Sequence, residues 1–313
     1  MPRSRSLPQL HDRLFLTDGG LETFLIHQQG VALPDFASFH LLDTYEGEAL
    51  VRDYFRPYAA IARRHGTGLI LDTLTWRASA DWGALSGLSA ADMVRINRRA
   101  VALLEELRDE FAPVPVVISG CLGPRGDGYV PGTQMTVRGA EAYHQPQVDA
   151  LADAGADMLT AMTLNYVEEA VGITHAARLA AMPIAISFTV ETNGRLPTGQ
   201  SLGSAIRIVD AATSGYPSYY MVNCAHPSHF AHLLDPRESW VRRIRGIRAN
   251  ASCRSHAELN DAAGLDTGDP VALAATYAEL RQRLPQLTVL GGCCGTDHRH
   301  VEAIAAACAP VAA

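Results

Sequence analysis

The chain has 313 residues, of which 48% are hydrophobic and 19% are charged, so it is long and apolar enough to bury a large core. Its net charge is −7, and the sequence contains no long run of residues with the same charge. Both observations argue against a nucleic-acid-binding surface and against a cationic membrane face. No stretch resembles a signal peptide or offers about 18 uninterrupted apolar residues. We therefore expect a cytoplasmic protein whose partners are small molecules, and we leave its oligomeric state open.

Short apolar runs rich in strand-forming residues recur along the chain, each separated from the next by a stretch able to form a helix. The runs cover residues 14–17, 68–72, 114–119, 158–163, 183–189, 219–223, 244–249 and 287–290. Apolar residues recur at helical spacing over 91–111. Pro270 is a suitable first residue for a helix over 271–284. Eight such units predict a single (β/α)8 TIM barrel domain over residues 1–313, with a doubly wound open sheet as the alternative.

Three of the six cysteines follow predicted strands whose carboxyl ends would meet at one face of such a barrel. Cys224 follows the sixth run, and the adjacent Cys293 and Cys294 follow the eighth. In an intracellular chain we expect reduced thiols or metal ligands rather than disulfides. Adjacent side chains diverge in regular structure, which disfavours a bond between Cys293 and Cys294. Three thiolates with a free fourth position describe a catalytic zinc site, because structural zinc normally takes four protein ligands.

The sequence around these cysteines resembles the homocysteine S-methyltransferase family over about residues 14–307. The resemblance rests on "VNCAHP" and "GGCCGT", supported by "DGGLET" after the first run, "SGCLGPRGD" after the third and "SFTVETNGRLPTGQSL" at the fifth. It implies that Cys224, Cys293 and Cys294 bind Zn²⁺. It also implies that a methyl group passes from a small donor, a sulfonium such as S-methylmethionine or a betaine, to a thiol acceptor such as homocysteine, which gives methionine.

This chemistry suits a zinc-thiolate site for a physical reason. A free thiol has a pKa of about 8.5 and reacts as its thiolate, and a bound zinc ion keeps a sulfur deprotonated at neutral pH. A cationic donor loses its charge as the methyl group leaves. The rings of Trp76, Tyr129 and Tyr166, on predicted loops at the same face, could cradle such a cation. Ordinary aromatic packing is the alternative for these three side chains.

The remaining candidate substrate contacts follow the first, sixth and seventh runs: Asp18, Gly19, Gly20, Glu22, Thr23, Asn223 and Asn250. The resemblance favours Asp18 as a carboxylate that contacts the substrate or supports such a contact, although an aspartate before two glycines can also form a turn. The glycines would let the backbone approach a ligand closely, or would simply make that turn. Both asparagines could hydrogen-bond either substrate or barrel backbone, and we favour the backbone for Asn223.

Two departures from the family pattern bear on the acceptor. A family glutamate after the fourth strand helps to hold the amino group of homocysteine, but Met162 occupies that position here. Glu22 stands where the family commonly has glycine, so it is a candidate replacement carboxylate; its alternative is to stabilise the start of the following helix. A different small thiol acceptor stays open, and so does a non-catalytic barrel in which zinc or a disulfide only staples the fold. A zinc hydrolase is disfavoured, because no H-E-x-x-H arrangement occurs.

Overall fold

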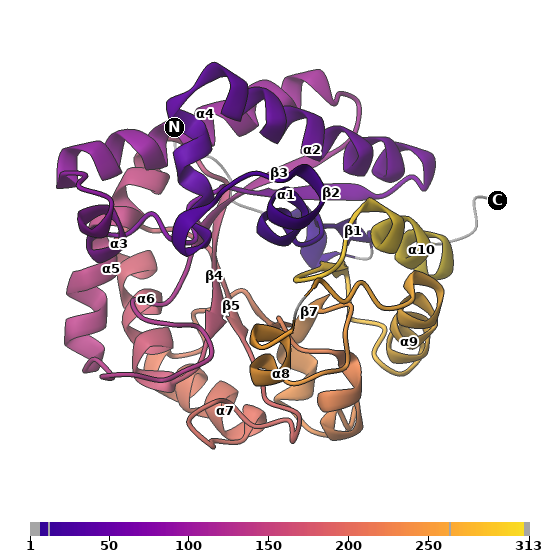
Figure 1. Cartoon of the computed structure of the whole chain (residues 1–313). Coiled ribbons are helices and arrows are strands. Elements are labelled where there is room, and N and C mark those ends of the chain that lie inside the picture. Colours follow the sequence, from indigo (N-terminus) through magenta and orange to yellow (C-terminus); the bar gives the residue numbers. More distant parts are fainter. Residues whose placement is uncertain (1–6, 12, 263, 310–313) are drawn as a thin grey trace.

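The computed structural model describes residues 7–309 except 12 and 263, and its strands close into a parallel barrel. Figure 1 shows the strands at the centre of a ring of helices. The strands are β1 (Phe15–Leu16), β2 (Gly68–Asp72), β3 (Val116–Leu122), β4 (Met158–Leu164), β5 (Ile184–Phe188), β6 (Tyr219–Asn223), β7 (Ile244–Ala249) and β8 (Val289–Gly292). Since β1 pairs with both β2 and β8, the predicted (β/α)8 barrel is confirmed and the open sheet is wrong.

Helices cover the outer wall of the barrel, with α1 and α8 drawn over its centre in Figure 1. The α-helices are α1 (Leu21–Gln29), α2 (Tyr45–Arg64), α3 (Ala80–Leu85), α4 (Ala90–Glu110), α5 (Val137–Asp153), α6 (Val167–Leu179), α7 (Leu202–Thr213), α8 (His256–Asn260), α9 (Pro270–Arg283) and α10 (His298–Cys308). The helices expected at 91–111 and after Pro270 are thus α4 and α9. Their apolar faces pack against the strands in the main hydrophobic core.

The connection between β6 and β7 differs from the expected helix. It consists of short 3-10 turns, η4 (Pro227–His229), η5 (Ala231–Leu233) and η6 (Val241–Arg243). Pro227 and Pro236 divide the segment, and a proline inside a helix removes a hydrogen bond and clashes with the preceding turn. Further 3-10 turns are η1 (Pro8–Leu10), η2 (Pro34–Phe36) and η3 (Ser38–Asp43).

The interior of the barrel is divided between an apolar and a polar part. The apolar part consists of the buried side chains Leu7, Phe15, Ile70, Val117, Met158, Ala185, Tyr219, Met221 and Val289. Further along the strands, hydrogen bonds join the inward side chains of neighbouring strands, including Ser119 to Thr160 at 2.7 Å and Ser187 to Asn223 at 2.6 Å. A buried polar layer needs such partners. The polar layer therefore lies toward the carboxyl ends of the strands, where the active sites of (β/α)8 barrels are found.

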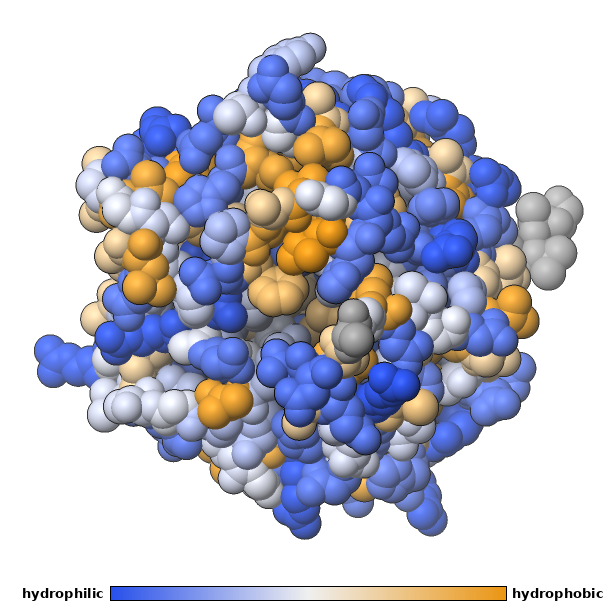
Figure 2. All heavy atoms as spheres, viewed as in Figure 1, coloured by the Kyte–Doolittle hydropathy of each residue, from blue (hydrophilic) through white to orange (hydrophobic). Residues whose placement is uncertain are grey.

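Figure 2 shows the face seen in Figure 1 with all atoms drawn. A hollow lies near the centre of this face, bordered by hydrophobic residues on the side of α1 and by hydrophilic residues on the side of α8. Within the described part of the chain, no helix combines the length and the apolar character that crossing a membrane requires.

Candidate metal centre

The three predicted cysteines converge at the carboxyl ends of β6 and β8. Their sulfur atoms all lie within 4.8 Å of one another, and Sγ of Cys224 lies 3.6 Å from Sγ of Cys294. Among the described residues, this is the one group of three or more histidine, cysteine or acidic side chains close enough to share a metal ion. Burial raises the pKa of the Cys294 thiol to about 11, so in a metal-free site it is protonated at neutral pH.

The structure corrects one expectation about these thiols. Cys224 and Cys293 are joined in a disulfide, although we expected reduced cysteines. Their Cα atoms are 5.4 Å apart, which is within the usual range for a disulfide, because the two loops meet over the barrel. The adjacent Cys293 and Cys294 are not bonded to each other, in agreement with the sequence argument. Metal binding by all three sulfurs therefore requires reduction of the disulfide.

The backbone of Cys224 is held in a left-handed conformation, with φ at 53°. Such a conformation costs free energy in a residue other than glycine, so its surroundings must impose it. Its N–H donates to the Arg248 carbonyl at 3.0 Å, and its own carbonyl accepts from Asn250 Nδ2 at 3.1 Å and lies 2.5 Å from His256 Nε2. The loop after β7 thus fixes the position of this sulfur.

The predicted glycines approach the protein's own backbone. A Cβ atom at Gly20 would lie 2.5 Å from the carbonyl oxygen of Cys293, and one at Gly19 would lie 2.7 Å from that of Thr296. Thr23 joins the same segments, because its Oγ1 accepts from Gly295 N–H at 3.1 Å. The loop after β1 therefore packs directly on the loop that carries the cysteine pair.

Asp18 lies beside an arginine that the sequence analysis missed. Arg248, on β7, points into the barrel and forms ion pairs with both Asp18 and Asp72. Asp18 also accepts a hydrogen bond of 3.1 Å from Tyr54 Oη. Nη1 of Arg248 lies 3.8 Å from Sδ of Met162. The charge of Asp18 is thus already countered within the protein.

Burial dominates the electrostatics of this cluster. It raises the pKa of Asp18 and raises that of Asp72 to about 6, in both cases against the opposing effect of Arg248. Burial also acts to lower the pKa of Arg248, but Asp18 and Asp72 outweigh it and hold that pKa above its usual value. The second oxygen of Asp72, Oδ1, has no hydrogen-bond partner among the described residues.

Glu22 lies in the first turn of α1 and is half-buried. Its Oε1 accepts a hydrogen bond of 2.8 Å from Ser38 Oγ, on η3. Burial raises the pKa of its carboxyl group, and Asp18 adds to the effect. The negative charge of Glu22 also acts to raise the pKa of the Cys294 thiol, although burial is the larger cause.

Both predicted asparagines are engaged with the barrel. Oδ1 of Asn223 accepts from Thr163 N–H at 2.9 Å and from Ser187 Oγ at 2.6 Å, while its Nδ2 donates to Thr163 Oγ1 at 2.8 Å. Thr163 has a φ of 60°, so Asn223 holds a strained residue of β4. Nδ2 of Asn250 binds the Cys224 carbonyl, and its buried Oδ1 has no partner in the described structure.

The three predicted aromatic residues have different surroundings. Tyr129 Oη donates to Cys224 Sγ at 3.1 Å, and its ring stacks on His256 with centroids 4.2 Å apart. One face of Trp76 is covered by the guanidinium of Arg77, 3.9 Å from the ring centroid. Tyr166 Oη accepts from the N–H of Met135 at 3.2 Å. Of the three, Tyr129 alone contacts a cysteine of the centre.

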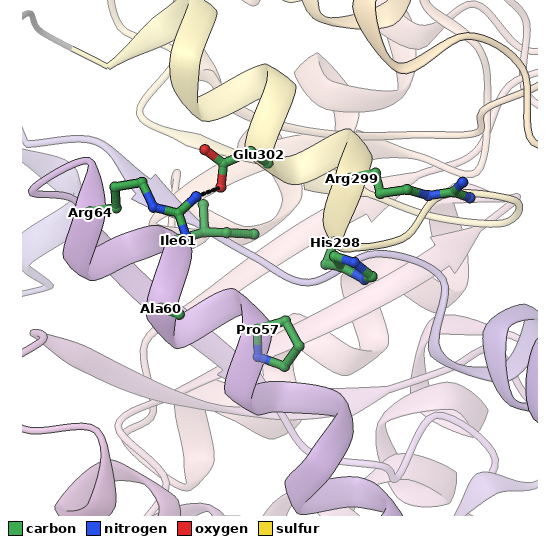
Figure 3. Close-up of a pocket in the computed structure, with 7 residues that line it drawn as sticks. All are labelled: Pro57, Ala60, Ile61, Arg64, His298, Arg299 and Glu302. Carbon is green, nitrogen blue, oxygen red and sulfur yellow. Dashed lines mark hydrogen bonds and ion pairs between the residues drawn. The ribbon is translucent and has the colours of Figure 1, made fainter.

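A second hollow lies on the outer wall, between α2 and α10 (Figure 3). It is lined by Pro57, Ala60, Ile61, Arg64, His298, Arg299 and Glu302. Arg64 Nη1 and Glu302 form an ion pair of 2.5 Å across it. This hollow is lined by helices alone and contains none of the cysteines, so the candidate site is the centre at the strand ends.

The closed barrel and the convergent thiols define a (β/α)8 barrel with a cysteine centre at its carboxyl face. A model of the homocysteine S-methyltransferase family matches residues 15–308. The chain therefore belongs to the homocysteine S-methyltransferase family, and it is an enzyme of the methyltransferase class. The family resemblance found in the sequence is confirmed.

Two relatives are similar along much of their length. The homocysteine S-methyltransferase of Escherichia coli (strain K12) is 26% identical, covering 98% of this chain and 99% of the relative. Homocysteine S-methyltransferase YbgG of Bacillus subtilis (strain 168) is 25% identical over 75% of this chain and 77% of the relative.

Solved structures of the homocysteine methyltransferase MmuM from Escherichia coli share the fold. Its oxidized form has a TM-score of 0.73 at 23% identity and covers 96% of this chain and 98% of that chain. Its metallated form has a TM-score of 0.72 at 20% identity and covers 95% and 96%, respectively.

Proposed function

We propose that this enzyme is a zinc-dependent S-methyltransferase that moves a methyl group from a small cationic donor to the thiol of homocysteine or a closely similar acceptor. The observation that carries the proposal is the convergence of Cys224, Cys293 and Cys294 at the carboxyl end of the barrel. A catalytic zinc site typically has three protein ligands and one position for water or substrate.

The geometry of the thiols fits zinc. With Zn–S bonds of about 2.3 Å in a tetrahedral site, two ligand sulfurs lie about 3.8 Å apart. The sulfurs of Cys224 and Cys294 are separated by 3.6 Å. After reduction of the disulfide, a small rotation of the Cys293 side chain would move its sulfur away from that of Cys224 to the distance that zinc ligands require. Zinc held by the three thiolates would keep the thiol of the acceptor deprotonated at neutral pH.

The residues around the thiols hold and shield this centre. Tyr129 donates a hydrogen bond to one sulfur, which stabilises negative charge there. Asn250 and His256 fix the carbonyl of Cys224, and Gly20 lets the loop after β1 pack on the cysteine pair. These contacts fix the geometry, and fixed geometry between two substrates contributes strongly to a transfer reaction.

Glu22 is the carboxylate best placed to receive the amino group of an amino-acid thiol. Asp18 is paired with Arg248 and Tyr54, whereas among the described residues the side chain that hydrogen-bonds Glu22 is the neutral Ser38. An ammonium group that enters a partly dry pocket needs such a counter-charge. We propose that Asp18, Gly19, Gly20 and Thr23 shape the acceptor pocket from the loop after β1. Asn223 and Asn250 support it through Thr163 and Cys224.

A second acceptor class is favoured by one observation. Met162 and Arg248 occupy the region in which the family glutamate would add negative charge, so a small thiol without an amino group would also be accommodated. A sulfonium such as S-methylmethionine and a betaine remain the donor candidates, since both lose positive charge on transfer.

Reduced, zinc-loaded protein tests the proposal directly. Mass spectrometry would follow methylation of homocysteine and of amine-free thiols with each donor, before and after chelation. Zinc X-ray absorption should show the sulfur count rising from about three to four when an active acceptor is added. Turnover that survives chelation, or a sulfur count that an active acceptor leaves unchanged, would contradict the proposed function.

A further inference from the structure

Arg77, in the segment after β2, is a buried cation without an ion pair among the described residues. Only 6% of its surface is exposed. Its guanidinium lies between two indole rings, 3.9 Å from the centroid of Trp76 and 3.8 Å from that of Trp82. Its hydrogen bond within the described structure runs from Nη1 to the carbonyl of Gly126 at 2.8 Å. The buried Nε has no acceptor among residues 7–309 as described.

The contrast with Arg248 shows what Arg77 lacks. Both guanidinium groups are buried at the same end of the barrel, but Arg248 is paired with Asp18 and Asp72, whereas Arg77 has two rings and a carbonyl. Stacking on aromatic faces stabilises a guanidinium in part. A buried charge without a counter-charge, and a buried donor without an acceptor, still cost free energy.

Arg77 keeps its charge in this environment. Burial lowers its pKa to about 10, against the opposing electrostatic effect of Asp127, Tyr129, Asp35 and Glu22. The group is therefore cationic at neutral pH. Asp127 directs Oδ1 to the backbone N–H groups of Tyr129 and Val130 and does not pair with the guanidinium.

The position of Arg77 connects it to the cysteine centre. Gly126, which accepts its hydrogen bond, belongs to the loop that continues to Tyr129, and Tyr129 donates to Cys224 Sγ. On the other side, Nε1 of the stacked Trp76 lies 3.4 Å from the carbonyl of Met162. The guanidinium thus lies between the loops that follow β2 and β3, at the same end of the barrel as the cysteine centre.

We propose that Arg77 binds the carboxylate of one of the two small substrates through the edge formed by Nε and Nη2. This inference rests on the proposed function, which supplies an acceptor and a donor. A planar guanidinium presents two parallel N–H groups to a carboxylate, an arrangement that an ammonium group cannot reproduce. The two indoles hold the plane of the guanidinium, and Gly126 occupies the opposite edge. Amino-acid thiols, betaines and methylated amino-acid sulfoniums all carry the required carboxylate.

Matched substrates distinguish the two sources of the carboxylate. Homocysteine is compared with 3-aminopropane-1-thiol, glycine betaine with tetramethylammonium, and S-methylmethionine with (3-aminopropyl)dimethylsulfonium. Arg77→Met should raise KM or Kd for the carboxylated member of the affected pair roughly 10- to 100-fold, with little change for its carboxylate-free partner. Arg77→Lys should show most of the same loss, because it keeps the charge but not the planar edge. The affected pair identifies the substrate that Arg77 holds.

Arg125→Met is the matched control, since Arg125 also lies over an aromatic ring, 5.0 Å from the centroid of Tyr143, but is exposed and paired with Asp81. Equal losses for both members of every pair, or no loss in any, would overturn the assignment. Calorimetric binding of homocysteine and of glycine betaine to wild-type and Arg77→Met protein tests the contact without turnover. Binding that depends on Arg77 in a protein that methylates no thiol would therefore contradict the proposed function alone.

Discussion

Tyr129 Oη lies 3.1 Å from Sγ of Cys224, although the two residues are 95 positions apart in the sequence. The ring of the same tyrosine stacks on His256, whose Nε2 lies 2.5 Å from the carbonyl oxygen of Cys224. Loops after β3 and β7 therefore hold one cysteine of the centre from its side chain and from its backbone. Removing either contact should affect the chemistry of the sulfur more than the stability of the barrel.

The first prediction concerns that hydroxyl group. Tyr129→Phe should lower zinc affinity or kcat/KM by about 10-fold, because groups that hydrogen-bond metal ligands typically contribute 10- to 100-fold. Zinc affinity is measured by competition with a chromophoric chelator, and kcat/KM by mass spectrometry. Tyr143→Phe is the control, since that hydroxyl bonds Ser79 at 2.9 Å, outside the cysteine centre. Wild-type values for Tyr129→Phe in both measurements would show that the hydrogen bond has no role.

The second prediction concerns the metal. Reduced wild-type protein should bind about one zinc ion per chain, and Cys294→Ser should lose most of that zinc together with activity. The far-ultraviolet circular dichroism should be retained, because the barrel is held by its apolar core. Cys253→Ser is the control, since Cys253 is exposed and outside the group. Full zinc occupancy in Cys294→Ser, measured by elemental analysis, would exclude Cys294 as a ligand.

Glu22 is tested with two acceptors. Glu22→Gln should lower kcat/KM for an amino-acid thiol about 10-fold or more, with little effect on a thiol that lacks the amino group, because the lost counter-charge matters only to an ammonium. Glu46→Gln controls for a helix-terminal role, since Glu46 lies in the first turn of α2 and is exposed. If Glu22→Gln changes kcat/KM equally for both thiols, recognition of the ammonium group by Glu22 is wrong. The same conclusion follows if the substitution changes only the melting temperature, as Glu46→Gln does.

Asp72 gives a prediction about pH. Burial raises its pKa to about 6 in the folded protein, above the value of about 3.9 expected in an unfolded chain. The folded state then binds the proton more tightly, so the stability that this group contributes is complete below about pH 4 and is lost as the pH rises through 6. The unfolding free energy of the wild type relative to Asp72→Asn should therefore fall between pH 4 and pH 7, by on the order of 3 kcal/mol.

Urea denaturation at several pH values measures this difference. Asp149→Asn, at an exposed position of α5, is the control for the same substitution at the surface. A difference between wild type and Asp72→Asn that stays constant or grows with pH would contradict the prediction.

The strand spacing of the barrel could be predicted because buried parallel strands are short continuous apolar runs. The ends of the strands were less predictable. The third run is predicted over residues 114–119, but β3 begins at Val116 and continues through Gly120 to Leu122. A Cβ atom at position 120 would lie 2.9 Å from Cδ2 of Leu159 on β4, so the glycine meets a packing requirement that arises only when the strands are adjacent.

The cysteines were predictable from the positions that follow strands, whereas Arg248 and Arg77 were not. On β7 the apolar Ile247 and Ala249 pack outward against the helices, so the inner face carries Arg248. Sequence alternation alone does not say which face of such a strand is inside. The signal that could have identified Arg248 is a charged residue within a run expected to be buried on both faces. Arg77 required the rings of Trp76 and Trp82 to be placed in space.

The joint between β1 and β8 has a consequence for how the enzyme is made. β1 contributes Phe15 and Leu16 to the sheet, and the joint continues through Gly292 N–H to Asp18 O at 2.9 Å and Gly20 N–H to Thr296 O at 3.0 Å. β1 is synthesised well before β8, so the fold and the reactive centre are completed only once the later segment has been made. A nascent chain released before Val289 lacks β8 and, with it, two of the three sulfurs. Incomplete translation products should consequently be inert toward thiols rather than weakly active.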